Sequence, residues 1–256
     1  MTQSVGLNRE LTLGQRKLRA KFENVSPQFR KAGELLPGGE IYHLQTGWAC
    51  QFESLSNGSR AIVDVFLPGD MIGLDGALHT WRPEEMLTLT AVTMRAILAE
   101  DALLDLMAYR PAALYVAWLL SKRQQRADLR LAAISCLDAP GRLAMMLLDF
   151  YTRLRRKKLI TGSTYNLPLT QVQIAHYLGL TVVYINRVLR SLREAGIVNV
   201  EKHCVTILDL ERLTRLAENG GIVSSSGAGV RERSLTEIVA PASKIGSAAP
   251  IGIAGN

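Results

Sequence analysis

Residues 167–193 have the sequence LPLTQVQIAHYLGLTVVYINRVLRSLR, and this stretch decides the fold of the region around it. Gln173 follows Thr170 by three positions, the spacing of a capping box, so we expect a helix to begin there. Gly179 suits the left-handed backbone conformation that ends a helix, and Thr181 can cap a second helix. The stretch therefore predicts two short helices joined by a tight turn.

The apolar residues of these two helices are spaced so that they face each other across the turn. We expect three residues of the first helix to pack against four of the second: Ile174, Ala175 and Leu178 against Ile185, Val188, Leu189 and Leu192. The second helix ends near Gly196, and strand-like runs follow at 197–200 and 204–208. A helix pair followed by a hairpin is typical of a winged helix-turn-helix.

The charge of the chain gathers in the same region. The net charge of the whole chain is +7, and residues 140–218 hold 12 Lys and Arg against 6 Asp and Glu, a net of +6. Residues 1–139 hold 15 charged side chains of each sign and are neutral. A basic region beside a neutral one indicates a polyanionic partner, most often nucleic acid, although a solvated basic surface gives the same counts.

The outward face of the second helix supplies candidate contacts to double-stranded DNA. Arg187 can form two hydrogen bonds to a guanine, and Asn186 can pair with an adenine. Val182 and Val183 suit a thymine methyl group. Phosphate or further groove contacts are expected from other residues of the region: Thr170, Gln171, Thr181, Tyr184, Arg190 and Lys202. The basic run 153–158 is interpreted as a solvated helix end, with phosphate contact as the alternative.

Upstream, residues 35–110 contain short apolar runs that are broken by turns. Asn57 and Gly58 mark a hairpin turn between two of these runs. The strand-like runs lie at 41–44, 48–52, 61–67, 87–92 and 94–98. Many short strands of this kind indicate a small barrel or jelly roll.

Between the two regions, residues 111–138 predict one long helix. Small or apolar residues alternate along it by four and three, and this 3.5-residue repeat indicates the seam of a two-stranded coiled coil. The seam residues are Ala113, Ala117, Leu120, Gln124, Ala127, Leu131 and Ile134. An amphipathic helix packed on its own domain is the alternative. The stretch 138–141, which contains Pro140 and Gly141, breaks the helix and predicts a hinge.

The remaining parts complete an α+β fold. Residues 1–34 are expected to form a helical or irregular arm, and residues 139–217 the winged helix-turn-helix domain. The tail 218–256 is rich in Gly, Ser and Ala, so we expect it to be disordered. The longest apolar run, 112–120, is too short to span a bilayer and no signal peptide is visible, so we expect a cytoplasmic protein with no membrane partner.

The sequence also argues against catalysis. The three cysteines at positions 50, 136 and 204 lie too far apart for a local metal site, and each is interpreted as a buried small apolar residue. A Walker-type loop, a His-Glu-x-x-His motif and a dinucleotide fingerprint are all missing from the sequence. We therefore expect no enzyme activity, no cofactor and no metal.

The order of these parts resembles the Crp/Fnr family of bacterial transcription regulators. The resemblance covers roughly residues 35–215 and rests on Gly47 with Trp48, on the turn at 68–73 and on residues 167–171. It implies a cyclic-nucleotide-binding-like β-roll, a dimerisation helix and a winged helix-turn-helix. The resemblance further implies a homodimer on a pseudo-palindromic operator. It leaves RNA polymerase open as a further partner and the effector unidentified.

The chain departs from the family pattern at the ligand positions. Members that bind cyclic nucleotides hold the phosphate with a Gly-Glu pair after the turn and an Arg-Ser or Arg-Thr pair further along. Here Leu74 follows Gly73, and Glu85 and Met86 stand near the second position. Leu cannot accept a hydrogen bond and Glu repels phosphate, so we expect no dependence on cyclic AMP. Members with an iron–sulfur cluster use four cysteines, which three dispersed cysteines cannot replace.

A further departure concerns the DNA sequence that is read. Many relatives carry an Arg-Glu pair where Val182 and Val183 stand, so the operator is expected to differ. The alternative to a DNA-binding regulator is a ligand-sensing or protein-interaction module whose helix-turn-helix only packs. Equal binding to duplexes of any sequence would favour that alternative.

Overall fold

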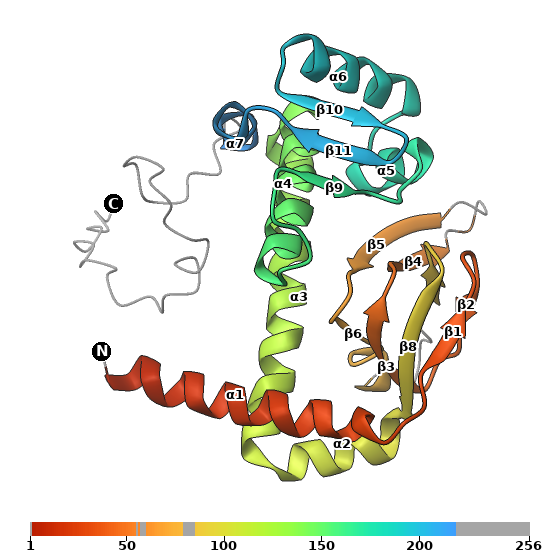
Figure 1. Ribbon diagram of the computed structural model, residues 1–256, viewed down its shortest axis with the longest axis vertical. Coiled ribbons are helices and arrows are strands. Elements are labelled where there is room, and N and C mark those ends of the chain that lie inside the picture. The colour runs from red at the N-terminus through yellow and green to blue at the C-terminus, as the bar shows by residue number, and fades with distance from the viewer. Residues whose placement is uncertain (1, 55, 57–59, 79–84, 219–256) are drawn as a thin grey trace, which may run out of the picture. The chain divides into compact units, whose positions relative to one another are not determined.

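The computed structural model describes residues 2–54, 56, 60–78 and 85–218 (Figure 1). The predicted hairpin turn at Asn57 and Gly58 lies outside the described residues, as does the predicted tail from residue 219 onward. The α+β fold class is confirmed. Among the described residues, no single helix is long and apolar enough to cross a membrane, although α2 (Ala99–Ala108) and α3 (Arg110–Cys136) meet that test as a pair bent by 119°.

Two sheets of antiparallel strands form the predicted roll. The first sheet has the order β1 (Gln28–Arg30), β8 (Val92–Leu98), β3 (Glu40–Thr46), β6 (Met71–Ile72). The second has the order β2 (Leu35–Leu36), β7 (Glu85–Thr88), β4 (Ala49–Ser54), β5 (Arg60–Phe66). Strand β1 belongs to the predicted arm, yet it pairs with β8. The sheet therefore begins before the predicted boundary at residue 35.

Two glycines of the roll occupy positions that no other residue fits well. Gly47 has φ +78°, and a Cβ atom there would lie 2.3 Å from the Ala91 carbonyl oxygen. Gly73 has φ +85°, and its Cβ would lie 2.3 Å from the Glu40 carbonyl oxygen. Both the positive φ and the close backbone approach require glycine. These two residues are also marks of the family resemblance.

Helices pack at one end of the roll. Helix α1 (Thr2–Glu23) buries Leu18 and Phe22 against α2 and the first turns of α3. Helix α3, predicted over 111–138, begins at Arg110 and ends at Cys136. A short 3-10 turn, η1 (Gly76–Leu78), follows β6.

The C-terminal half holds the winged helix-turn-helix. Its helices are α4 (Ala139–Arg156), α5 (Gln171–Leu178), α6 (Val182–Glu194) and α7 (Leu210–Glu218). Its sheet has the order β10 (Val198–Glu201), β11 (Cys204–Ile207), β9 (Thr164–Asn166). The sequence analysis did not predict β9 or α7. Strand β9 contributes only three residues, too few to show an alternating pattern.

The cysteines are only partly as predicted. Cys50 on β4 is buried, and this burial raises the pKa of its thiol to about 12. Cys136 and Cys204 are exposed, so the prediction of a buried residue is wrong for both. Cys136 is the last residue of α3, and Cys204 opposes Glu201 next to the turn of the β10–β11 hairpin. Neither position faces a core.

Candidate nucleic-acid interface

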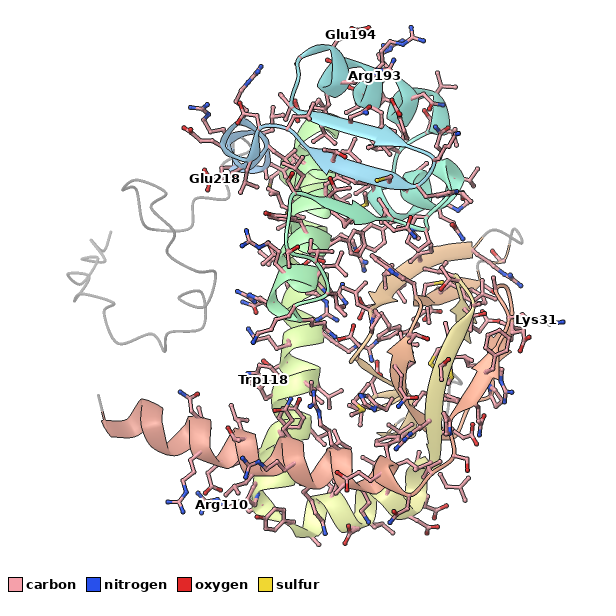
Figure 2. All side chains as sticks on the ribbon, viewed as in Figure 1. Lys31, Arg110, Trp118, Arg193, Glu194 and Glu218 are labelled. Carbon is pink, nitrogen blue, oxygen red and sulfur yellow. The ribbon has the colours of Figure 1, made fainter. Side chains whose placement is uncertain are left out.

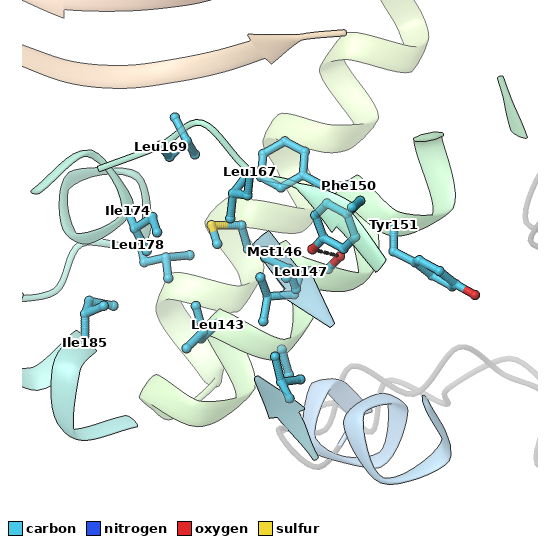
Figure 3. Close-up of a cluster of buried hydrophobic side chains, with 14 of the residues drawn as sticks. Leu143, Met146, Leu147, Phe150, Tyr151, Leu167, Leu169, Ile174, Leu178 and Ile185 are labelled. Atoms are coloured by element: carbon cyan, nitrogen blue, oxygen red, sulfur yellow. Dashed lines mark hydrogen bonds between the residues drawn. The ribbon is translucent and has the colours of Figure 1, made fainter. Parts of the chain in front are cut away.

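An apolar core beneath α6 fixes the orientation of the predicted DNA-reading helix (Figure 3). Leu147 of α4, Ile174 and Leu178 of α5, and Ile185 of α6 are each at most 4% exposed. The hydroxyl of Tyr165 on β9 donates a hydrogen bond to the Leu147 carbonyl oxygen at 2.9 Å. Helix α6 therefore has one face anchored to two helices, and the neighbouring sheet is tied to the same core.

The turn between α5 and α6 has the predicted caps. The Thr170 Oγ1 accepts from the Gln173 amide at 3.2 Å, and the Gln173 Oε1 accepts from the Thr170 amide at 2.8 Å. Gly179 has φ 64° and ψ 40°, the left-handed conformation. The Thr181 Oγ1 accepts from the Tyr184 amide at 3.3 Å. The capping box, the glycine and the second cap are confirmed.

The opposite face of α6 is open to solvent. Val183 is 75% exposed and Tyr184 is 41% exposed. Asn186, Arg187 and Arg190 are exposed as well. The Arg187 guanidinium carbon lies 6.0 Å from the centre of the Tyr184 ring, so these two side chains are neighbours. The structure thus brings the predicted base-reading side chains of α6, apart from Val182, onto one exposed surface.

Val182 does not lie on the fully exposed surface, so its predicted outward position is wrong, and its contact with the groove stays a prediction. Its side chain is half-buried and packs on the apolar core together with Leu189. The reason is helical spacing: Val182 precedes Ile185 by three positions and Leu189 by seven, which places it on the buried face. Val182 therefore helps to hold the first turn of α6.

The wing presents the predicted Lys202 at its tip. Strands β10 and β11 are joined by Lys202 and His203, with φ of 46° and 67°, and both side chains are exposed. Gln171, at the start of α5, is exposed too. His203 was not predicted as part of this surface, although a two-residue turn between Glu201 and Cys204 exposes both of its residues.

Arg193 is a second residue that the sequence analysis missed. Figure 2 shows it beside Glu194 at the end of α6, and its side chain is exposed. Together with Arg187 and Arg190 it forms a series spaced by three, which places a cation on each of the last turns of the helix. The spacing by three could have identified Arg193 from the sequence.

The basic run 153–158 is divided between two environments. Arg155, Arg156 and Lys158 are exposed, as predicted for a solvated helix end. The side chain of Arg153 is only 11% exposed and pairs with Asp70 of the roll at 3.0 Å, so the prediction is wrong for this residue. The Asp70 carboxylate is a charged partner within the protein, and no local spacing in the sequence indicates this contact across the fold.

The predicted coiled-coil seam of α3 keeps exposed surface along its whole length. Ala117, Gln124 and Leu131 are exposed, and the other seam residues are half-buried: Ala113, Leu120, Ala127 and Ile134. The Gln124 Nε2 donates to Asp128 Oδ1 at 2.8 Å within the same helix. None of the seam residues of α3 is fully buried, so this stripe is available to a partner helix. The homodimer stays a prediction.

The ligand positions of the roll carry apolar or acidic side chains. Leu74 and Met86 are each 2% exposed and belong to the apolar interior. Glu85 is exposed, and its Oε2 accepts from the Ser54 hydroxyl at 2.5 Å. The first position is therefore apolar and buried, and the second presents a carboxylate at the surface.

Two family models match this chain. A cyclic nucleotide-binding domain matches residues 31–110, and a Crp-like helix-turn-helix domain matches residues 141–216. The first match covers the roll from β2 onward together with α2, and the second covers most of the segment from α4 to α7.

Curated relatives and solved structures agree with these matches. The anaerobic regulatory protein of Pasteurella multocida is 27% identical over 188 residues, which are 73% of this chain and 67% of the relative. A CRP-like cAMP-activated global transcriptional regulator of Mycobacterium tuberculosis is 28% identical over 71% of this chain and 81% of its own length. The fold resembles the structure of FixK2 from Bradyrhizobium japonicum, with a TM-score of 0.66 and 21% identity over 75% of this chain and 96% of that one.

These findings share one architecture, namely a nucleotide-binding-type roll, a long helix and a terminal helix-turn-helix in the same order. The named relatives are regulatory proteins. The chain belongs to the Crp/Fnr family of transcription regulators.

Proposed function

We propose that the chain binds DNA as a homodimer and that each protomer reads one half of a pseudo-palindromic site through α6. The observation that carries this proposal is the exposed face of α6, which projects from a helix anchored by its buried face. On this surface Arg187 reads a guanine, Asn186 an adenine and Val183 a thymine methyl group. Exposed side chains around it, those of Gln171 and Lys202, contact phosphates and set the register of the domain.

The exposed stripe of α3 supports the dimer. Parallel pairing of two α3 helices along this stripe gives the complex a two-fold axis, which a pseudo-palindromic site shares. The two half-sites are then expected about 10 base pairs apart, one turn of the duplex. Because its partner is chromosomal DNA, we assign the protein to the cytoplasm.

We further propose that DNA binding does not require cyclic AMP. The buried Leu74 leaves no acceptor for a ribose hydroxyl, and the carboxylate of Glu85 repels a phosphate. The named activation of the mycobacterial relative by cAMP therefore does not extend to this chain.

The test is selection of bound duplexes from a random-sequence DNA pool by the full chain, without nucleotide and at near-physiological salt. We expect enrichment of a palindrome with two half-sites one turn apart. The Arg187→Ala chain is the matched comparison, and it should relax one position in each half-site. Equal recovery of all sequences by the unmodified chain would overturn the proposal.

A parallel selection tests the cyclic AMP claim. Addition of cyclic AMP should change neither the enriched sequence nor its affinity. The cAMP-activated mycobacterial relative serves as the positive control in the same assay. Enrichment by this chain only in the presence of the nucleotide would contradict the claim.

A further inference from the structure

A carboxylate of the roll is held by two cations from the DNA-binding half. Asp70, in the turn before β6, accepts from Arg153 at 3.0 Å and from Lys157 at 2.5 Å, and both cations lie at the end of α4 or just beyond it. Arg153 also donates to the Val65 carbonyl oxygen at 2.7 Å, and Lys157 to the Pro68 carbonyl oxygen at 2.8 Å. We call this group, with Asp70 at its centre, the Asp70 cluster.

The Asp70 carboxylate stays charged although it is half-buried. Burial by itself would raise its pKa, but the positive charges of Arg153 and Lys157 and a hydrogen bond from the Leu67 amide together lower the pKa below its usual value. A half-buried carboxylate that stays charged needs its partners, so separation of the two parts carries an electrostatic cost.

A second carboxylate of the roll is held by two cations of α3 in the same way. Asp64 on β5 accepts from Arg123 at 3.2 Å and from Arg126 at 2.9 Å. Arg123 also bonds to Asp75 and to the Gln51 side chain. Asp75 directly follows Leu74, so the part of the roll where relatives hold a phosphate here receives a guanidinium from its own chain. We call this group the Asp64 cluster.

Apolar contacts join the same parts. The ring centres of Trp48 in the roll and Phe150 in α4 lie 5.5 Å apart, edge to face. Phe150 in turn contacts Tyr177 of α5, with 6.2 Å between ring centres. Trp48 and the roll residues Val65 and Leu67 belong to the apolar cluster that contains the core of the helix-turn-helix. The roll and the C-terminal half are therefore joined both by the charged clusters and by a shared apolar core.

We propose that the Asp70 cluster, supported by the Asp64 cluster between the roll and α3, forms an internal clasp that holds the DNA-reading domain against the roll in its DNA-binding arrangement, in place of a bound effector. This inference rests on the proposed DNA binding. The arrangement is competent because the clasp engages α3, α4 and the roll, while the recognition face of α6 and the wing tip remain exposed. Signals that open the clasp would lower DNA affinity.

The first test compares Asp70→Asn with Asp149→Asn. Both substitutions remove a carboxylate partner of Arg153, but Asp149 lies within α4 and pairs with Arg153 only inside that helix, at 3.4 Å. Asp70→Asn should weaken binding to the selected operator about tenfold, whereas Asp149→Asn should remain within twofold of the unmodified chain. Operator affinity without nucleotide is the first readout.

Amide hydrogen exchange of the DNA-free protein is the second readout. Asp70→Asn should speed exchange at residues 150–158 and 64–70, which face each other across the clasp, and leave α5 and α6 protected. This readout needs no DNA, so it separates failure of the clasp from failure of the proposed DNA binding. Unchanged exchange together with unchanged affinity overturns the clasp, and so does tighter operator binding by Asp70→Asn.

A milder variant guards against loss of folding. Lys157→Gln removes one cation and keeps the Arg153–Asp70 pair, so it should shift both readouts in the same direction by a smaller factor. If Asp70→Asn does not fold, Lys157→Gln decides alone: faster exchange at 64–70 with two- to threefold weaker operator binding supports the clasp. Exchange and affinity equal to those of the unmodified chain overturn it.

Discussion

Arginines serve opposite purposes in two regions of this molecule. On α6, Arg187, Arg190 and Arg193 point into solvent and are open to an incoming polyanion. On the side of α3 and α4 that faces the roll, Arg123 and Arg153 have side chains only 16% and 11% exposed, and both are paired with carboxylates. The same type of side chain is exposed to solvent in one region and joins two parts of the fold in the other.

The two groups of arginines differ in the hydration that they lose on folding and in whether their charge remains available to a ligand. An exposed guanidinium loses little hydration and interacts weakly with its own protein, so its charge remains available to phosphates and bases. A guanidinium that is largely buried has given up most of its water and depends on its partners, so its removal leaves its carboxylate with one cation fewer. Substitutions on the exposed face of α6 should therefore change DNA binding alone, whereas substitutions in the clusters should change stability and, through the clasp, operator affinity as well.

The largest effect is expected for Arg153→Ala. It leaves Asp70 with Lys157 as its remaining cation, and breaking a buried pair of this kind costs about 3 kcal/mol. Urea unfolding followed by circular dichroism measures the change, with exposed Arg156→Ala as the control, for which less than about 0.5 kcal/mol is expected. Equal unfolding midpoints for the two variants would contradict the distinction between arginines that pair with the roll and arginines that are exposed.

Arg187→Ala should have the next largest effect, on binding alone. Loss of two hydrogen bonds to a guanine should cost about 1–3 kcal/mol of affinity for the selected operator. Affinity for a duplex of unrelated sequence should hardly change, because the residue reads a base. The unfolding midpoint should stay that of the unmodified chain, since the side chain is exposed. A matching loss on both duplexes would make Arg187 a phosphate contact instead.

The DNA-binding half was largely predictable because its signals are local. Thr170 with Gln173, Gly179 and Thr181 each act over a few residues, and the structure places each as the spacing indicates. Val182 was misplaced because the first residue of a helix was assigned to the outward face without following the spacing to Ile185 and Leu189. That error could have been avoided from the sequence.

The connection between the halves could not be predicted in the same way. Arg153 and Asp70 are 83 positions apart, and Arg123 and Asp64 are 59 apart. A charged side chain in a sequence is expected at the surface. Only the folded structure shows that these arginines pair with carboxylates that are distant in sequence. The pairing in the clusters is a property of tertiary structure, without a local spacing to reveal it.

Thr170→Ala should have a smaller effect than either arginine substitution. Removal of the capping hydroxyl from α5 should cost about 1 kcal/mol of stability, because the Gln173 amide loses its acceptor. Thr170→Ser keeps the hydroxyl and is the control, expected within about 0.5 kcal/mol of the unmodified chain. Thermal or urea unfolding checks this. The result allows the stability that the Thr170 cap contributes to be compared with that of the Arg153–Asp70 ion pair.

Arg190→Ala is expected to have a small effect on stability and the most diagnostic effect on binding. Its side chain is exposed, so unfolding should change by less than about 0.5 kcal/mol. If Arg190 contacts one phosphate per protomer, the slope of log affinity against log salt should fall by about 0.9 per protomer, on the operator and on unrelated duplexes alike. Arg187→Ala on the operator is the internal control, because a base contact costs affinity without this uniform change of slope on every sequence. A slope that stays constant while operator affinity falls would move Arg190 from the phosphates to the bases, and the reading surface of α6 would then extend by one further turn.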